Sequence, residues 1–215
     1  MSPAIQLQEA HLKERIFENA WDRFRTDGFA RVSVDEIASA LAISKKTFYK
    51  VFASKEQLVE QIVERMMGQI ATQLDRITRA DTSFVTKLGE LLSYMATVPA
   101  RVGFPLMHDI QRHLPQLWKR IEQFRAERIN DTFGRLLEQG ILEGYIRPEL
   151  NKRLFLLAYL AAVQQVMQPA VLSNESFSAR DAAHGIMEIF FAGAFTERGR
   201  KEFASLRAHI PSSTV

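Results

Sequence analysis

Apolar residues recur along this chain at intervals of three and four positions, the spacing that places them on one face of an α-helix. No stretch alternates apolar and polar residues convincingly, and no dipeptide typical of a tight β-hairpin is found. The pattern therefore predicts an all-α protein. The expected helices span 9–26, 34–41, 45–52, 54–79, 83–98, 115–140, 149–167 and 179–196, with a short one between Pro99 and Pro105.

The N-terminal part of the chain carries closely spaced helix starts. Gly28 follows the first helix and is expected to end it in a left-handed conformation. Ser33 and Ser54 are each followed three positions later by a Glu or a Gln, which is the capping-box pattern, and Ser44 is a further candidate cap. Short helices joined by tight turns predict a helix-turn-helix unit.

Composition narrows the class of protein. The 215 residues are 47% hydrophobic, which is enough for a substantial core in one or two domains. The chain has no cysteine, so disulfides, thiolate zinc sites and a thiol nucleophile are excluded. Its start does not read as a signal peptide, and its longest apolar stretch, 154–163, is far shorter than the roughly 20 residues of a membrane span. We expect a cytoplasmic protein with no membrane partner.

The short helix expected at 45–52 has two different faces. On a helical wheel, Phe48, Val51 and Phe52 lie on one side and must pack against the preceding helices. Lys46 and Lys50 point directly away from them. The flanks of the outer face add Lys45, Thr47 and Tyr49.

This outer face suits DNA. Lysines neutralise phosphates, hydroxyls fix the register on the backbone, and a helix is narrow enough for the major groove. Lys46 and Lys50 are the residues closest to where base edges would lie. Lys55, in the first turn of the next helix, lies where free backbone N–H groups favour an anionic oxygen. The net charge of +3 does not decide between DNA binding and the solvated face of an ordinary bundle helix.

The segment VSVDEIASALAISKKTFYKVFASKEQL, within residues 15–62, resembles the N-terminal domain of the TetR (tetracycline repressor) family of bacterial transcription regulators. The similar features are a hydrophobic first helix ending at Gly28, the Ser-Val-x-x-Ile-Ala start, the Thr-Phe-Tyr core of the third helix, and Phe52 followed by Ser-Lys-Glu. The resemblance implies phosphate contacts by Thr47, Tyr49 and Lys55. The full set of DNA contacts that it implies is Ser33, Lys45, Lys46, Thr47, Tyr49, Lys50 and Lys55.

Two positions depart from the family pattern. Ala42 stands where the family often has Gly in the turn, and Val51 stands where a polar residue is common. Neither threatens the fold, but Val51 removes one phosphate contact. The segment before Lys13 carries no Lys or Arg, which argues against a basic minor-groove arm.

The resemblance also implies an organisation and a function. Residues 1–54 are expected to form the helix-turn-helix DNA-binding domain, and residues 55–215 a helical bundle for effector binding and dimerisation. The expected function is that of a repressor that binds a near-palindromic double-stranded operator as a homodimer and is released by a small, largely apolar effector, with no cofactor. An architectural DNA-binding protein without a switch is one alternative. A helical-bundle enzyme is another, although no catalytic motif marks the chain.

The two last expected helices are candidates for dimerisation. The helix at 149–167 is apolar nearly all round, so it needs a second surface to pack against, and the helix at 179–196 mixes aromatic with small residues. A two-fold four-helix interface and an intrachain core both satisfy this pattern. The interface candidates are Leu157, Leu160, Ile186, Phe190 and Phe191.

A set of apolar and aromatic residues in the C-terminal part could line an effector pocket, since such sites are mostly apolar with few polar groups. Core packing explains these residues equally well. Asp109 and His113, four apart, could share a helical face, but a hydrogen-bonded pair explains them better than a metal site, and no metal is expected. The pocket candidates are Met95, Phe104, Met107, His108, Trp118, Phe133 and Tyr159.

Overall fold

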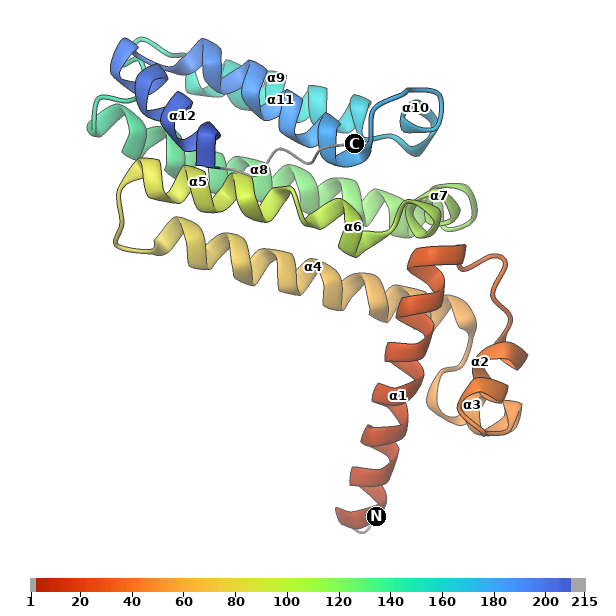
Figure 1. The fold of residues 1–215 in the computed structure, drawn as a ribbon. Helices are drawn as coiled ribbons and strands as arrows, with labels where there is room; N and C mark the ends of the chain where they lie inside the picture. Colours follow the sequence, from red (N-terminus) through yellow and green to blue (C-terminus); the bar gives the residue numbers. More distant parts are fainter. Residues whose placement is uncertain (1–2, 210–215) are drawn as a thin grey trace. The chain divides into compact units, whose positions relative to one another are not determined.

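The computed structural model describes residues 3–209, and it confirms the all-α expectation, since helices and no strand occur in this part of the chain (Figure 1). One isolated β-bridge joins Ile146 and Phe195. The helices are α1 (Pro3–Asp27), α2 (Val34–Ala40), α3 (Lys45–Val51), α4 (Lys55–Arg79), α5 (Phe84–Met95), α6 (Val98–Val102), α7 (Phe104–His113), α8 (Pro115–Leu142), α9 (Lys152–Val166), α10 (Pro169–Leu172), α11 (Ala179–Ala194) and α12 (Glu197–His209).

Three helices were not expected from the sequence. α7 and the short α10 each carry a proline in the first turn, Pro105 and Pro169, and the sequence pattern treats these prolines as breaks. α12 has too few apolar residues to give a periodic signal. α9 is also shorter than expected, because the side chain of Asn151 accepts a hydrogen bond from the N–H of Leu154 and fixes the helix start there.

The chain divides into two compact units. The first contains residues 1–69 and 100–119, and the second contains residues 70–99 and 120–215. The first unit therefore includes α7, which packs against α1. The expected boundary at residue 54 separates a DNA-binding domain from an effector-binding domain. It remains a prediction, because the two units are defined by compactness and not by what each of them binds.

In the first unit, side chains from α1 to α4 form one apolar core. The inward face of α3 is as expected, because Phe48 and Phe52 are both fully buried. Burial of one such side chain contributes about 1.5–3 kcal/mol. The other core residues include Ile16, Ala20, Phe24, Ile37, Ala38, Leu58, Val59 and Ile62.

The expected end of α1 and the expected caps at Ser33 and Ser54 are confirmed, but α1 begins at Pro3, earlier than expected. The Gln57 side chain accepts from the N–H of Ala53, so the capping box expected at Ser54 is incomplete. Gly28 has φ 81° and stops α1, as the left-handed conformation requires. At the start of α2, the N–H of Glu36 donates to the Ser33 hydroxyl, and the Glu36 carboxylate accepts from the Ser33 N–H. At the start of α4, the N–H of Gln57 donates to the Ser54 hydroxyl, with N···O 3.0 Å.

In the second unit, α9 and α11 pack side by side over a core of aromatic and aliphatic residues from α5, α8, α9 and α11. A buried polar network fixes α5 against α8. The Lys87 ammonium donates to the Gln139 side-chain oxygen at 2.7 Å, and the Gln139 amide donates to the Glu143 carboxylate at 2.6 Å. Glu143 in turn accepts from the N–H of Phe84. This network satisfies the first turn of α5.

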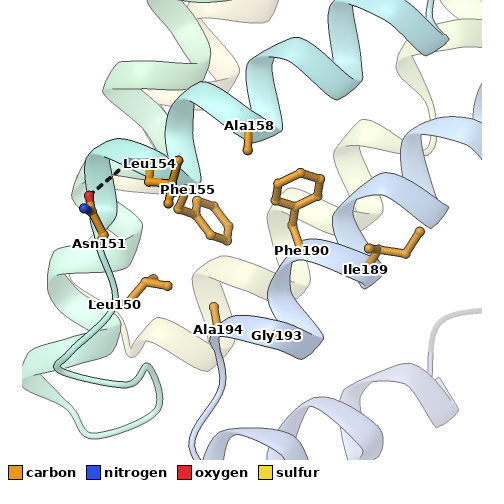
Figure 2. Close-up of a pocket in the computed structure, with 9 residues that line it drawn as sticks. All are labelled: Leu150, Asn151, Leu154, Phe155, Ala158, Ile189, Phe190, Gly193 and Ala194. Atoms are coloured by element: carbon orange, nitrogen blue, oxygen red, sulfur yellow. Dashed lines mark hydrogen bonds between the residues drawn. The ribbon is translucent and has the colours of Figure 1, made fainter.

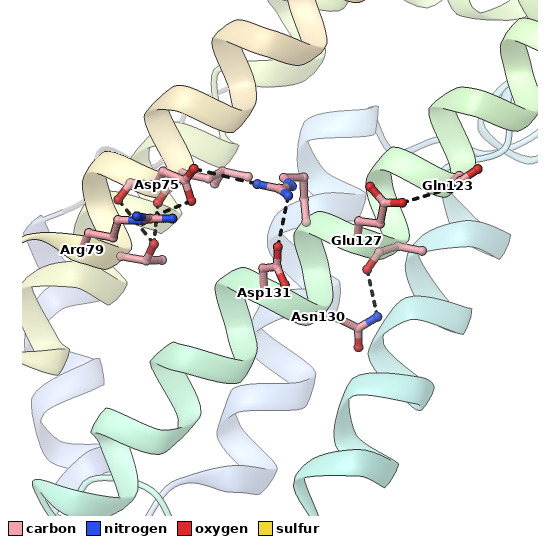
Figure 3. A network of polar contacts seen from close by, with 10 residues as sticks. Asp75, Arg79, Gln123, Glu127, Asn130 and Asp131 are labelled. Carbon is pink, nitrogen blue, oxygen red and sulfur yellow. Dashed lines mark hydrogen bonds and ion pairs between the residues drawn. The ribbon is translucent and has the colours of Figure 1, made fainter.

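A second polar network links the C-terminal end of α4 with α8 (Figure 3). Arg128 pairs with Asp131 on its own helix, with Nη2···Oδ2 3.0 Å, and reaches Asp75 of α4. Asp75 also pairs with Arg79. These are partly exposed ion pairs, so each contributes less than about 1 kcal/mol and chiefly specifies which helix faces meet.

Candidate nucleic-acid interface

Local interactions fix α3 in place. The Ser44 hydroxyl accepts the N–H of Thr47 at 3.0 Å, which caps the helix, and the two hydroxyls are 2.8 Å apart. On the inner side, Phe48 and Phe52 anchor the helix in the core with ring centroids 5.9 Å apart. A short helix held at its start and along its inner face presents its outer face in a defined orientation.

The outer face carries exposed cations and a hydroxyl. Lys46, Tyr49 and Lys50 are all exposed, and Thr47 is half-buried. The Tyr49 ring meets Phe48 edge-on, with centroids 5.4 Å apart, so the ring is supported while its hydroxyl end remains accessible. Within residues 3–209, no acidic side chain pairs with Lys46 or Lys50. Both ammonium groups are therefore available to an anionic partner.

Lys45 differs from its neighbours because it is paired within the chain. Its ammonium donates to the carboxylate of Asp35 in α2, with Nζ···Oδ2 2.9 Å. The hydrogen bond and the charge of Asp35 raise the pKa of Lys45, so the lysine stays cationic. Lys45 must leave Asp35, or share it, in order to bind a phosphate. No local pattern in the sequence marks Asp35 as the partner of Lys45.

The two remaining candidate contacts lie beside α3 and have intrachain partners. The Ser33 hydroxyl donates to Glu36 at 2.8 Å, and these hydrogen bonds from Ser33 lower the pKa of Glu36. The Lys55 ammonium donates to the carbonyl oxygens of Phe29 and Val32, at 2.9 and 3.0 Å. Lys55 therefore contacts the turn between α1 and α2.

A shallow apolar groove of about 340 Å³ runs between α9 and α11 (Figure 2). Leu154 and Ile189, two of the residues that line it, are 63% and 73% exposed, so the groove carries accessible aliphatic surface. The other lining residues are Leu150, Asn151, Phe155, Ala158, Phe190, Gly193 and Ala194.

The expected interface residues differ in exposure. Leu157 is 49% exposed on α9, and Leu160 and Phe190 are half-buried. Ile186 and Phe191 are buried, because their faces of α11 turn toward the core of their own chain. Neither side chain is accessible to a second copy in this structure.

The expected pocket residues divide between the two units. Phe133 and Tyr159 pack against each other with tilted rings in the core of the second unit, with ring centroids 4.6 Å apart. Burial raises the pKa of Tyr159, so its hydroxyl stays neutral. Met95 packs at the edge of the same core. Phe104 contacts His108 in the first unit, with centroids 6.4 Å apart. There, Met107 is half-buried and Trp118 is buried.

None of the described helices combines the length and apolar character that a bilayer span requires. Among the described residues, no three or more His, Asp or Glu side chains gather into a cluster that could hold a metal ion.

Comparisons with known proteins agree with the geometry of this site. Residues 16–62 match the model of bacterial regulatory proteins of the tetR family. The HTH-type transcriptional regulator YvaF of Bacillus subtilis is 23% identical over 184 residues, which cover 85% of this chain and 95% of the relative. The HTH-type transcriptional repressor KstR2 of Mycolicibacterium smegmatis is 24% identical over 70% of this chain and 75% of its own length.

Solved structures show the same fold. A transcriptional regulator from Cytophaga hutchinsonii superposes with a TM-score of 0.66 at 18% identity, over 85% of this chain and 98% of the other. KstR2 of Mycobacterium tuberculosis superposes with a TM-score of 0.57 at 20% identity, over 86% and 95%. The matched segment contains α2, α3 and the start of α4, where the exposed lysines lie. Residues 16–62 of this chain therefore carry a helix-turn-helix domain like that of the bacterial regulatory proteins of the tetR family.

Proposed function

We propose that this protein is a transcriptional repressor that binds a near-palindromic double-stranded operator as a homodimer and is released by a small, largely apolar effector. The outer face of α3 carries the proposal, because Lys46, Tyr49 and Lys50 are exposed on a helix anchored by buried Phe48 and Phe52. The face has the cations and hydroxyls that DNA binding requires, and its lysines at the centre have no intrachain acid to neutralise them within the described chain.

In the proposed complex, α3 enters the major groove. Lys46 and Lys50 neutralise phosphates and also reach base edges, where guanine offers two acceptors to a cationic donor. The hydroxyls of Thr47 and Tyr49 bind phosphates and set the register of the helix on the duplex. Lys45 adds a phosphate contact once it leaves Asp35.

The small size of the recognition helix α3 supports a dimer. A helix of seven residues covers only a few base pairs, so two copies related by a two-fold axis are needed for a useful operator, with recognition helices about 34–36 Å apart or somewhat more. The exposed aliphatic side chains along α9 and α11 support this face as the contact between copies. We assign Leu154, Leu157, Ile189 and Phe190 to the interface, in place of the buried Ile186 and Phe191.

The effector is proposed to be apolar because the second unit has a core rich in aromatic rings that contact one another, with few polar groups. Among the pocket candidates of the second unit, Phe133 and Tyr159 are in direct contact. The relative KstR2 is described as a ketosteroid transcriptional regulator, which makes bulky apolar compounds a reasonable first library.

The proposal is tested by selecting DNA from random oligonucleotides with the purified protein, followed by a screen for compounds that release it. We expect a small set of near-palindromic sites and at least one apolar compound that lowers DNA affinity. Binding spread over unrelated sequences would instead indicate an architectural protein. Turnover of a compound without any effect on DNA binding would indicate an enzyme.

A further inference from the structure

The Lys55 ammonium is occupied by backbone groups in this structure. It donates to the carbonyl oxygens of Phe29 and Val32 at 2.9 and 3.0 Å, and it lies 5.6 Å from the centre of the Phe29 ring. An ammonium group has only three N–H donors, so two of them are engaged by the α1–α2 turn. The remaining donor is not enough to make Lys55 a free phosphate-binding cation like Lys46.

The same turn is held from its other side by α7. The carboxylate of Asp109 accepts the N–H of Ala30, with Oδ2···N 2.8 Å. Gly28, with φ 81°, allows this approach, because a Cβ atom at that position would overlap the Asp109 carboxylate. His113, one turn further along α7, places its ring edge-on against Phe29, with centroids 6.2 Å apart.

Lys55 and Asp109 thus both hold the α1–α2 turn: the Lys55 ammonium donates to carbonyl groups of the turn, and the Asp109 carboxylate accepts from an N–H of the turn. We call this pair of side chains the clasp. Val32, at the end of this turn, directly precedes the Ser33 cap of α2, and α2 packs against α3. The clasp therefore fixes where the helix-turn-helix unit begins relative to α1 and α4.

We propose that Lys55 and Asp109 are positioning residues for DNA binding, which act by holding the α1–α2 turn and not by contacting DNA. The inference rests on the proposed use of the outer face of α3. It assigns to Lys55 a role different from the phosphate contact that the family resemblance implies. It also assigns a role to Asp109, which lies outside the segment that matches the family model.

The salt dependence of DNA affinity distinguishes a residue that contacts phosphate from a residue that positions the helix-turn-helix unit. The logarithm of DNA affinity falls with the logarithm of salt concentration by about 0.9 for each phosphate that a cation neutralises on duplex DNA. Affinity for the selected operator should be measured over a range of salt for the parent, Lys46→Met, Lys55→Met, Asp109→Ala and Asp109→Asn. Lys46→Met is the control, because its ammonium is exposed and has no acidic partner within the described chain.

We expect Lys46→Met to flatten the slope by about 0.9 for each copy bound. Lys55→Met and Asp109→Ala should each weaken binding about 3- to 10-fold, the size of a lost hydrogen bond, with the parental slope. Asp109→Asn should retain most of the affinity, since its amide oxygen can still accept from Ala30. Amide exchange at Ala30 should be faster in Asp109→Ala than in Asp109→Asn.

A slope that falls in Lys55→Met as it does in Lys46→Met would overturn the positioning role of Lys55. Parental affinity in Asp109→Ala would overturn that of Asp109. If Lys55→Met unfolds, Lys55→Gln, which keeps an amide donor and removes the charge, carries the same slope test. A parental slope in Lys46→Met would count against the proposed function itself. Failure of the positioning proposal and failure of the proposed function therefore give different results.

Discussion

The ammonium of Lys45 donates a hydrogen bond to the carboxylate of Asp35, so that a residue at the edge of the outer face of α3, which is proposed to bind DNA, is held by an acid of α2. Both side chains are more than half exposed, so the pair contributes little to folding. Its main consequence concerns DNA, because a lysine that is paired with an acid is a weaker phosphate-binding group than one that is not.

Removing the acid is therefore expected to strengthen general DNA binding. In Asp35→Asn, Lys45 is released, and affinity for random duplex should rise several-fold, with a salt slope steeper by up to about 0.9 per copy. Fluorescence anisotropy over a range of salt measures both. Glu56→Gln removes an exposed acid from the first turn of α4 and is the matched control for net charge. If both variants bind alike, the Lys45 pair has no specific effect.

Ala42 is expected to be a point of backbone strain. Its φ of 53° lies in the left-handed region, which costs a residue with a Cβ atom about 1–2 kcal/mol. Ala42→Gly should therefore raise the free energy of unfolding by up to about 1 kcal/mol in urea titrations, after the greater flexibility of unfolded Gly is subtracted. Ala40→Gly, at the end of α2, should lower it by about 0.5–1 kcal/mol. A loss of stability in Ala42→Gly would contradict this interpretation.

Features set by neighbouring residues were predictable from the sequence. The Ser33 capping box, the Ser44 cap and the left-handed Gly28 each depend on residues within a few positions of one another. The burial of Phe48 and Phe52 follows from helical periodicity alone. Local sequence therefore suffices to predict the exposed face of α3.

Features set by distant residues were not predictable. Lys55 contacts carbonyl groups 23 and 26 positions away, and Asp109 contacts an N–H 79 positions away. Periodicity identifies the face of a helix but not its tertiary partner. The same limit explains why Phe191, an expected interface residue, is buried in its own chain. α11 carries apolar residues on both its inner and its outer face, and only packing distinguishes buried Phe191 from exposed Ile189.

The α9–α11 groove gives a prediction about assembly. Ile189→Asp places a charge on the exposed edge of the groove, so it should dissociate the proposed dimer and abolish specific operator binding while the chain stays folded. Light scattering measures the assembly. Leu142→Asp is the control, because Leu142 is 87% exposed at the end of α8 and does not line the groove. A parent protein that is monomeric at micromolar concentration would contradict the prediction.

The contacts to base edges and to phosphates should differ in their mutational effects. Lys50→Ala is expected to relax sequence preference as well as weaken binding, because a donor to a base edge discriminates by about 1–3 kcal/mol. Tyr49→Phe removes only the hydroxyl and should weaken operator and random duplex by the same factor, since a phosphate contact carries no sequence information. Repeating the selection from random oligonucleotides with each variant tests this. An unchanged consensus with Lys50→Ala would remove Lys50 from the base-reading residues.

Gly68 is the weakest position in α4, and its replacement should change the response to the effector. Glycine in a helix costs about 1 kcal/mol relative to alanine, and a Cβ atom at Gly68 would meet nothing within 4 Å. Gly68→Ala should therefore raise unfolding free energy by about that amount and leave the DNA affinity of the effector-free protein unchanged. If α4 transmits the effector signal, Gly68→Ala should change the coupling free energy between effector binding and DNA binding. This coupling free energy is reciprocal and is typically about 1–3 kcal/mol. Calorimetric titration of both proteins with the effector, with and without operator, measures the coupling directly, and the same coupling in both would exclude Gly68 from the switch.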